Sequence, residues 1–224
     1  MSILSLKNIS YSYGATPVLD NLSYDFEAGN MYCIVGKSGA GKTTLLSILS
    51  GLAAPKQGSI FYKEQDIKSI DTYKFRSKYI GVIFQSFNLI TKFTAMENVM
   101  LSMDIAGVKN TRKKETAIEL LMNVGLTDEE ARRRVLKLSG GQQQRVAIAR
   151  ALSYNPDIIL ADEPTGNLDG DTQREIMQIF RELAEQGKCV ILVSHSPEVA
   201  EMCDICYELK KTAGRTKEME NHKN

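Results

Sequence analysis

The sequence predicts an α/β fold, with a parallel-sheet core, an antiparallel β subdomain and an inserted helical subdomain. Three observations predict it. Apolar and polar residues alternate over the first thirty residues, which is typical of antiparallel strands. Short continuous apolar runs, typical of buried parallel strands, occur at 31–35, 158–161 and 190–193. From 87 to about 135 the apolar residues instead recur with a helical period.

The N-terminal elements follow from local patterns. A turn between Gly14 and Pro17 separates two predicted antiparallel strands. The apolar run at 31–35 stops at a glycine and predicts a buried parallel strand. A helix follows, because apolar residues stand at positions i, i+3, i+4 and i+7 before residues 51–55 end it. The face that we expect this helix to bury consists of Leu45, Ile48, Leu49 and Leu52.

The second half of the chain changes period twice. Apolar residues with helical spacing at 99–105 and 117–124 predict helices of an inserted subdomain. Two further buried strands are then separated by a predicted crossover helix at 176–183. Because strands alternate with helices in this part of the chain, we expect the sheet to be parallel.

These elements predict one domain in two lobes. We expect a single domain over residues 1–210, with a catalytic lobe formed by about 1–86 and 154–210. The helical lobe is expected at about 87–153. A polar tail with mixed charges follows at 211–224, and such a segment is expected to fray.

Composition excludes several classes of protein. The chain has 224 residues, which corresponds to one or two domains of roughly 150 residues. Its 43% hydrophobic and 25% charged content is that of a globular protein and excludes a coiled coil, a collagen or a wholly disordered chain. The net charge of +1 provides no basic field for nucleic acid, so none is expected as a partner. The longest uncharged stretches have 13 residues, whereas a membrane-spanning helix needs about 20 apolar ones. No secretion signal is expected either, because Met1–Asn8 has no long apolar region.

The four cysteines predict packing and reduced thiols. Cys33 and Cys189 lie in apolar runs, where cysteine behaves as a small core residue. Cys203 and Cys206 have the C-x-x-C spacing of redox and metal sites. Neither a second such pair nor a nearby histidine completes a zinc site, so a structural role is favoured. Reduced thiols are typical of a cytoplasmic protein.

A glycine-rich segment predicts a phosphate-binding loop. It matches the pattern G-x-x-x-x-G-K-[ST], follows a predicted strand and opens a predicted helix. Glycines let successive N–H groups surround an anion, and the helix N-terminus adds positive potential. Lys42 is expected to reach the β- and γ-phosphates, and the Thr43 hydroxyl to bind Mg²⁺. The alternative is a purely structural glycine turn before a core helix. The expected nucleotide-binding residues here are Gly36, Lys37, Ser38, Gly39, Ala40, Gly41, Lys42, Thr43 and Thr44.

Two acidic residues end the apolar run at 158–161. Strand ends of a parallel sheet share one edge, so we expect Asp162 and Glu163 beside the phosphate loop. Asp162 suits a contact to Mg²⁺ through water, and Glu163 is placed to polarise an attacking water. Alone, an apolar run that ends in two acids is more typical of a strand-end turn, and the nearby phosphate loop favours the catalytic interpretation.

A third motif gives the sequence a family resemblance. Leu138-Ser139-Gly140-Gly141-Gln142 resembles the signature motif of ABC-type ATPases. The alternative is a purely structural serine cap at the start of a helix. This alternative is compatible with the resemblance, because such a helix terminus also binds anions. The resemblance implies an ABC-type P-loop NTPase with a RecA-like core, which binds and hydrolyses ATP with Mg²⁺. It also implies that Ser139, Gly140, Gly141 and Gln142 meet the γ-phosphate of ATP held by a second copy, in a head-to-tail homodimer with two shared sites.

The resemblance implies roles for further residues. Gln85 matches a glutamine that contacts Mg²⁺ and senses the membrane partner, and His195 matches a histidine that contacts the γ-phosphate. The implied catalytic residues are thus Glu163, His195, Lys42 and Gln85, and the implied metal ligands are Thr43, Gln85 and Asp162.

Two further segments match the family by position. Asn167-Leu168-Asp169 matches the loop between the two ATP sites. Tyr13 matches the aromatic residue that stacks on adenine, and Tyr11 is the competing choice.

The resemblance extends to a group of exporters. Residues 84–89 and 160–169 are similar to the ATPases of macrolide and lipoprotein exporters and their cell-division and peptide-resistance relatives. This implies a separate integral-membrane permease as partner, and a cytoplasmic protein peripheral on the inner face of the cell membrane. We expect the permease to dock near Gln85–Asn98, where an exposed apolar cluster would form the contact. The alternative is that these apolar side chains pack inside the helical lobe. The cluster consists of Phe87, Leu89, Phe93 and Met96. Non-transport ABC ATPases of translation or DNA repair are the alternative class.

Overall fold

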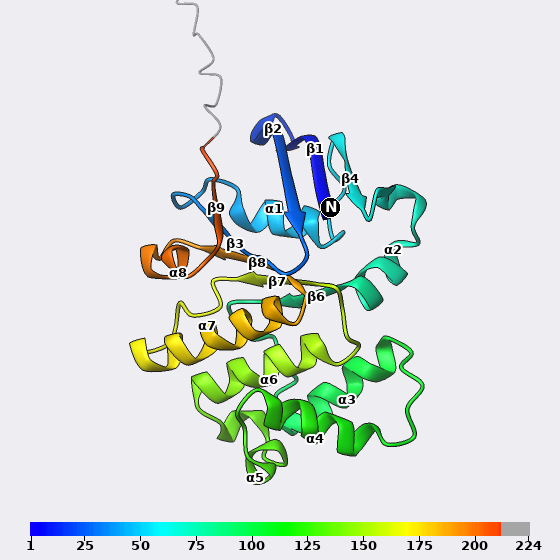
Figure 1. The fold of residues 1–224 in the computed structure, drawn as a ribbon, viewed down its shortest axis with the longest axis vertical. Coiled ribbons are helices and arrows are strands. Elements are labelled where there is room, and N and C mark those ends of the chain that lie inside the picture. The colour runs from blue at the N-terminus through cyan, green and yellow to red at the C-terminus, as the bar shows by residue number, and fades with distance from the viewer. Residues whose placement is uncertain (212–224) are drawn as a thin grey trace, which may run out of the picture.

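The computed structural model describes residues 1–211 as a parallel sheet between an antiparallel sheet and a helical lobe (Figure 1). The parallel sheet has the spatial order β6-β7-β8-β3-β9. Its strands are β6 (Ile80–Ile83), β7 (Ile158–Asp162), β8 (Cys189–Ser194), β3 (Met31–Val35) and β9 (Ile205–Glu208). This arrangement confirms the predicted fold class.

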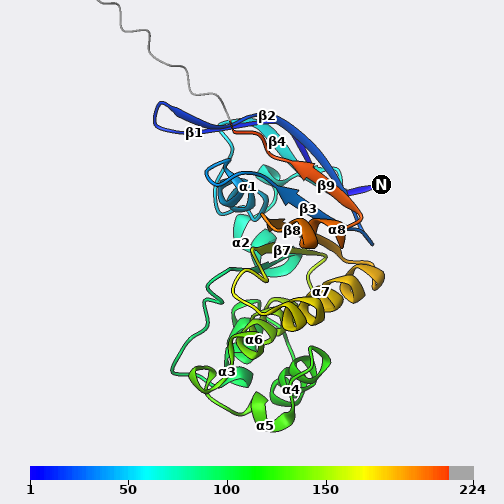
Figure 2. The same cartoon turned by 90° about the vertical axis from the view of Figure 1, so that its left-hand side faces the viewer.

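The antiparallel sheet has the order β2-β1-β4-β5. Its strands are β1 (Ser2–Tyr13), β2 (Thr16–Glu27), β4 (Gln57–Tyr62) and β5 (Gln65–Asp66). It covers one side of the parallel sheet together with helix α1 (Lys42–Leu49). Figure 2 shows this sheet edge-on above the core.

Helices form the opposite end of the molecule. The helical lobe contains α3 (Ala95–Ile105), α4 (Lys113–Asn123), α5 (Asp128–Ala131), the turn η3 (Val135–Lys137) and α6 (Gly140–Leu152). Helix α7 (Gly170–Glu185) lies between this lobe and the parallel sheet (Figures 1 and 2). Short elements complete the fold: η1 (Ile67–Ser69), α2 (Thr72–Lys74), η2 (Phe75–Tyr79) and α8 (Pro197–Glu201).

The parallel strands separate two hydrophobic cores. Along β3, Met31 and Cys33 face the helices, whereas Tyr32 and Ile34 face the antiparallel sheet. This alternation follows from the two-residue period of a strand, and it explains why β3 is apolar at every position. Cys189 is fully buried like Cys33 but on the opposite face, so the predicted core role of both residues is confirmed.

One predicted core residue is wrong. Helix α1 ends at Leu49, and Leu52 has 53% of its surface exposed rather than lying on the buried face. Gly51 adopts a left-handed φ of 69°, which ends the helix one residue before Leu52. The predicted fraying tail lies outside the described residues except for its first residue. Within residues 1–211, no helix is long and apolar enough to span a membrane.

Candidate functional site

The phosphate loop connects β3 to α1. Gly41 precedes the first residue of the helix with a φ of 96°, a conformation that favours glycine. A Cβ atom at Gly41 would also lie 2.8 Å from Cγ1 of Val18 and 2.9 Å from Cδ2 of Leu19. The close approach of β2 therefore requires glycine here. The Lys42 ammonium donates to the Gly36 carbonyl oxygen at 2.8 Å and thus lies over the loop.

The loop opens into a cavity of about 1100 Å³ at the carboxyl edge of the parallel sheet. It brings together sequence-predicted residues from four separate parts of the chain. Those that line it are Gly36, Lys37, Ser38, Gly39, Gly41, Lys42, Thr43, Thr44, Gln85, Asp162, Glu163 and His195. Ala40 is buried behind the loop and does not line the cavity. A volume of this size suits a nucleotide-sized ligand.

Oxygen ligands for a divalent cation meet on the cavity wall. The Thr43 hydroxyl donates to Oδ2 of Asp162 at 3.3 Å. Burial raises the pKa of Asp162, and the neighbouring Glu163 adds to the effect, while the Thr43 hydroxyl and Lys42 oppose it. A hydroxyl, a carboxylate and phosphate oxygens are ligands that Mg²⁺ prefers, so these residues fit that ion. Gln85 lies near Gly166, where a Cβ would be 3.6 Å from Nε2 of the glutamine.

The carboxylate of Glu163 is held by a small network. Its Oε1 lies 2.8 Å from Nδ1 of His195, and its Oε2 accepts from the Ser194 hydroxyl at 3.1 Å and from the His195 backbone N–H at 3.4 Å. Glu163 has a left-handed φ of 45°, and its own N–H donates to the Val193 carbonyl oxygen at 2.9 Å. A strained backbone fixed in this way is typical of functional residues. The Glu163 side chain is only 12% exposed, whereas that of His195 is 69% exposed and faces the cavity.

The signature segment does not line this cavity. Ser139 caps the N-terminus of α6, where its hydroxyl accepts from the Gln142 N–H at 3.3 Å and the Gln142 side chain accepts from the Ser139 N–H at 2.9 Å. Gly141 packs against α7, since a Cβ there would lie 2.6 Å from Cγ2 of Thr172. Ser139 and Gly140 are exposed. The first turn of α6 is therefore exposed and lies outside the cavity of its own chain.

The two candidate adenine-stacking tyrosines differ in exposure. Tyr13 is 60% exposed at the end of β1, whereas Tyr11 is partly buried against the core. Their rings meet edge to face with centroids 5.1 Å apart. Neither residue lines the cavity.

Four residues near the site were missed by sequence reasoning. Val18, Val35 and Glu208 line the cavity, and Ser194 donates to the Glu163 carboxylate. Val18 and Glu208 belong to strands whose pairing brings them to the loop, and no local pattern indicates this. Ser194 stands directly before the predicted His195 at the end of an apolar strand, and that position is the signal that would have found it.

Comparison with known proteins decides the family. The profile described as "ABC transporter" matches residues 19–166, which is more than half of the chain. The chain belongs to the ABC transporter family. It is 43% identical over 221 residues to the ABC transporter ATP-binding protein YclH of Bacillus subtilis (strain 168), and the alignment covers 97% of this chain and 98% of YclH.

Solved structures agree with this assignment. The ABC ATPase resembles a dimeric structure of MJ0796, described as a bacterial ABC transporter cassette, with a TM-score of 0.83 and 39% identity. That likeness covers 92% of this chain and 94% of the other. A second dimeric structure of MJ0796, in a post-hydrolysis state bound to ADP and Pi, has a TM-score of 0.84 and 36% identity. It covers 95% of this chain and 98% of that one.

The apolar cluster predicted on this ABC ATPase is not an exposed surface. Phe87, Leu89 and Met96 are partly buried and pack against the core of the helical lobe, and Phe93 is also half-buried. The Arg150 side chain fixes the same segment, since its Nη2 donates to the Phe87 carbonyl oxygen at 2.9 Å. Packing, the alternative left open by the sequence, accounts for these side chains.

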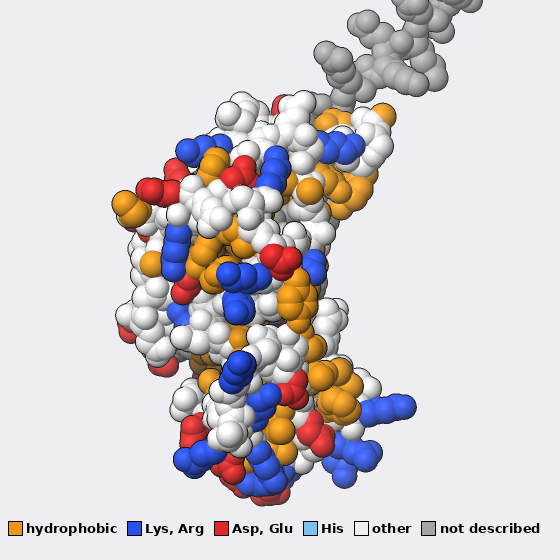
Figure 3. All heavy atoms as spheres, turned by 90° about the vertical axis from the view of Figure 1, so that its right-hand side faces the viewer, with side chains coloured by type: hydrophobic (Ala, Val, Ile, Leu, Met, Phe, Trp, Pro, Cys, Tyr) orange, Lys and Arg blue, Asp and Glu red, His pale blue; other side chains and the backbone are white. Residues whose placement is uncertain are grey.

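Exposed apolar groups lie nearby instead. Ile90, Tyr73 and Ile105 are exposed by between 41% and 55%. Tyr73 and Ile105 line a groove of about 220 Å³ where α2 and α3 meet, and the Tyr73 hydroxyl donates to the Ile105 carbonyl oxygen. Figure 3 shows hydrophobic side chains near the middle of this face of the molecule.

Proposed function

We propose that this ABC ATPase completes its ATP sites by pairing head to tail with a second copy. The carrying observation is that residues 139–142 lie outside the cavity that all the other predicted phosphate-contacting motifs line. The N-terminus of α6 is nevertheless a suitable anion-binding terminus, because it is exposed and has a serine cap. In a head-to-tail pair, each signature faces the γ-phosphate in the partner's cavity. The two solved structures of MJ0796 are described as dimeric, which supports pairing of two copies.

Within one copy, phosphates are bound by the loop amides and Lys42. The Lys42 ammonium hydrogen-bonds to the Gly36 carbonyl oxygen, and ATP would offer it stronger, charged partners. Thr43, Asp162 and Gln85 would hold Mg²⁺. The ion would neutralise negative charge that develops as the γ-phosphoryl group departs.

Glu163 is the proposed base for the attacking water. Its carboxylate is nearly buried and oriented by Ser194 and His195, which reduces the reorganisation needed during reaction. His195 is exposed to the cavity and is the group proposed to contact the γ-phosphate. Contact with phosphate would compete with its bond to Glu163, which would then be released towards water.

Removing the charge of Asp162 is expected to stabilise the ATPase without nucleotide. Because burial raises its pKa in the folded state, ionisation of Asp162 opposes folding. This loss of folding stability is absent below the pKa that Asp162 has in the unfolded chain. It grows as the pH rises through the pKa that Asp162 has in the folded protein. Asp162→Asn should therefore raise Tm at pH of about 7 by about 1–3 °C, and this gain should shrink towards pH of about 4. Differential scanning calorimetry without nucleotide measures both, and a lower Tm at neutral pH would contradict this account.

Tyr13 is proposed to stack on adenine, because its ring is free of the core. Tyr13→Ala is expected to weaken ATP binding about 5-fold to 100-fold, the range for loss of one base–aromatic contact. The measurement is fluorescence titration with an ATP analogue, with binding of inorganic triphosphate as a reference that should not change. Tyr11→Ala is the comparison, and a larger loss of affinity there would reverse the assignment.

We propose that the partner is a membrane permease of the macrolide- and lipoprotein-exporter type. Residues 84–89 and 160–169 support that group, and the coarser membership in the transporter family is established. The groove between α2 and α3, next to Gln85–Asn98, is the proposed docking place. It provides apolar contacts at Tyr73 and Ile105 close to the Gln85 segment, which reaches the ATP cavity. The protein would then work at the inner face of the cell membrane.

Ile105→Glu should impair this docking without affecting ATP hydrolysis by the subunit itself. A charge in an apolar groove leaves a desolvated carboxylate in the complex, and we expect at least about a tenfold weaker interaction. Binding to the cognate permease in nanodiscs, measured by biolayer interferometry, tests it. Met122→Glu is the matched control, because Met122 is 52% exposed on α4. If Ile105→Glu and Met122→Glu bind the permease equally well, the interface lies elsewhere. If the native subunit binds no permease, the alternative function in translation or DNA repair is favoured.

A further inference from the structure

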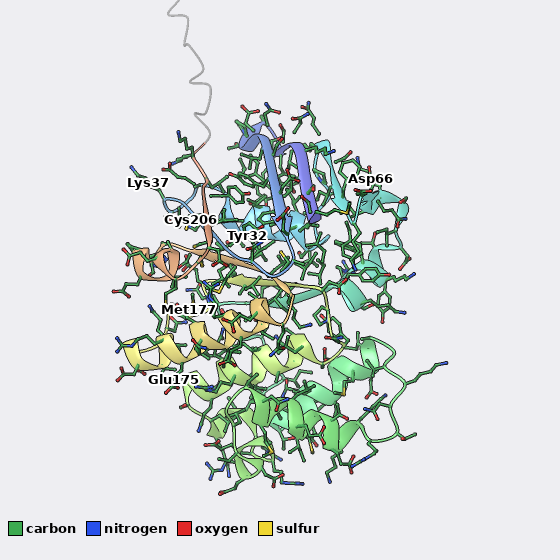
Figure 4. All side chains as sticks on the ribbon, in the orientation of Figure 1. Tyr32, Lys37, Asp66, Glu175, Met177 and Cys206 are labelled. Atoms are coloured by element: carbon green, nitrogen blue, oxygen red, sulfur yellow. The ribbon has the colours of Figure 1, made fainter. Side chains whose placement is uncertain are left out.

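Three of the four cysteines meet on one face of the parallel sheet. Cys33 on β3 and Cys206 on β9 are register partners on adjacent parallel strands, so their side chains lie on the same face of the sheet. Cys203, in the turn before β9, packs against the core that contains Cys33. Cys33 is fully buried, Cys203 is half-buried and Cys206 is exposed, and all are free. Figure 4 shows Cys206 between Lys37 of the phosphate loop and Met177 of α7.

The turn that carries these thiols is fixed in place. The carboxylate of Asp204 accepts from the Met31 N–H at 2.7 Å and from the Arg181 guanidinium at 2.7 Å. Arg181 also donates to the Met202 carbonyl oxygen at 2.6 Å. The Cys206 thiol donates to the Ala200 carbonyl oxygen at 3.3 Å. Cys206 is therefore held against Cys33 rather than on a free loop.

The spacing of the two strands suits a covalent link. Adjacent strands lie about 4.8 Å apart, which falls within the roughly 4.4–6.8 Å between the Cα atoms of disulfide-bonded residues. Strand β9 is a short edge strand with only one neighbour in the sheet, so it can move to close the bond. Among residues 1–211 no group of three or more potential side-chain ligands has the geometry of a metal site, which favours thiol chemistry over metal binding.

The thiol pair lies directly behind the ATP cavity. Two residues after Cys33 and Cys206, the same strands pair Val35 with Glu208, and both of these residues line the cavity. One residue further along β9's chain, the Leu209 carbonyl oxygen lies close to the phosphate loop. A Cβ atom added at Gly36 would be only 2.7 Å from this oxygen. Any shift of β9 relative to β3 is thus transmitted to the start of the phosphate loop.

We propose that Cys206 and Cys33 form a peroxide-sensitive disulfide that weakens ATP binding. The Cys206 sulfur attacks hydrogen peroxide, the O–O bond breaks, and a sulfenic acid forms while the second oxygen leaves as water with the thiol proton. The Cys33 sulfur then attacks the Cys206 sulfur, and the hydroxyl leaves as water with the proton of Cys33. Two thiols lose two electrons, and one peroxide becomes two waters. Closing the Cβ atoms to about 3.8 Å, less than the strand spacing of about 4.8 Å, tilts the edge strand β9 against β3 and displaces the phosphate-loop amides.

The experiment treats the full chain with hydrogen peroxide and identifies the crosslink by mass spectrometry. The expected product joins tryptic peptides 8–37 and 189–210, with the loss of two hydrogens. ATP affinity should fall about threefold to tenfold and recover with dithiothreitol, because small displacements of binding groups have effects of this size or larger. Cys206→Ser, at an exposed position, should abolish both the crosslink and the loss of affinity, and Cys33→Ala should do the same.

Cys189→Ser is the matched control. Cys189 belongs to the same tryptic peptide as Cys206 but is buried on the other face of the sheet, so its replacement should leave the crosslink intact. A crosslink that persists in Cys206→Ser and disappears in Cys203→Ser would overturn the assignment. The proposal would also be wrong if the native chain gave only a Cys203–Cys206 bond or sulfinic acids, or if the crosslinked protein bound ATP as tightly as the reduced one.

Discussion

Glu163→Gln is expected to reduce ATP turnover by at least about a hundredfold while the protein still binds ATP. The substitution keeps the size of the side chain and its acceptor oxygen for Ser194, so the pocket should retain its shape. It removes the carboxylate that would take a proton from the attacking water, and positioned general bases contribute about 10²–10⁴-fold. Steady-state phosphate release, together with ATP binding by equilibrium titration, measures both quantities.

The control for this variant is Ser194→Ala. It removes one hydrogen bond to the Glu163 carboxylate but leaves the base itself in place, so only a partial loss of turnover is expected. Native turnover in Glu163→Gln would show that another group activates the water. A loss of ATP binding in Glu163→Gln would instead show that Glu163 helps to bind ATP before the reaction.

Gly140→Asp is expected to lower ATP turnover by at least about a hundredfold, although Gly140 lies outside the cavity of its own chain. The residue is exposed and has open space, since the nearest atom to an added Cβ is Cδ2 of Leu168 at 3.9 Å. A carboxylate at the first turn of α6 also suits the helix dipole, so the fold should tolerate it. In the dimer, however, it would face the γ-phosphate of the partner's ATP. Loss of one such electrostatic contact costs about 10²–10³ in rate.

Gly140→Ala is the matched variant without charge. It fills the same space and should retain most of the turnover, while both variants should bind ATP within about twofold of the native affinity. Phosphate release measured at several protein concentrations checks this prediction. Native turnover by Gly140→Asp would contradict the proposal that the signature meets the partner's nucleotide.

The fold and much of the site could be predicted because they depend on contiguous patterns. The central parallel strands β3, β7 and β8 have continuous apolar runs, and the phosphate loop carries its full set of glycines within eight residues. Such motifs sit at strand ends, and a parallel sheet brings its strand ends to one edge. Gln85, Asp162 and His195 could therefore be expected at one cavity, and the structure places all three on its wall.

Features that depend on pairing between distant segments could not be predicted. The bonds of Glu163 to Ser194 and His195 need the register of β7 against β8. The sequence left open whether Phe87 and Leu89 are exposed or packed, because a loop sequence does not show that Arg150 and the helical lobe cover these side chains. Contact between Cys33 and Cys206 likewise requires the pairing of β3 with β9.

The ATP-dependent mass of two variants in solution tests the central claim of shared ATP sites most directly. Light scattering after size-exclusion chromatography with Mg·ATP should give Glu163→Gln twice the 24.9 kDa of one chain, because hydrolysis no longer separates the copies. Glu163→Gln combined with Gly140→Asp should bind ATP and remain a single chain. A single chain for Glu163→Gln, or a dimer that persists when Gly140→Asp is added, would contradict the account.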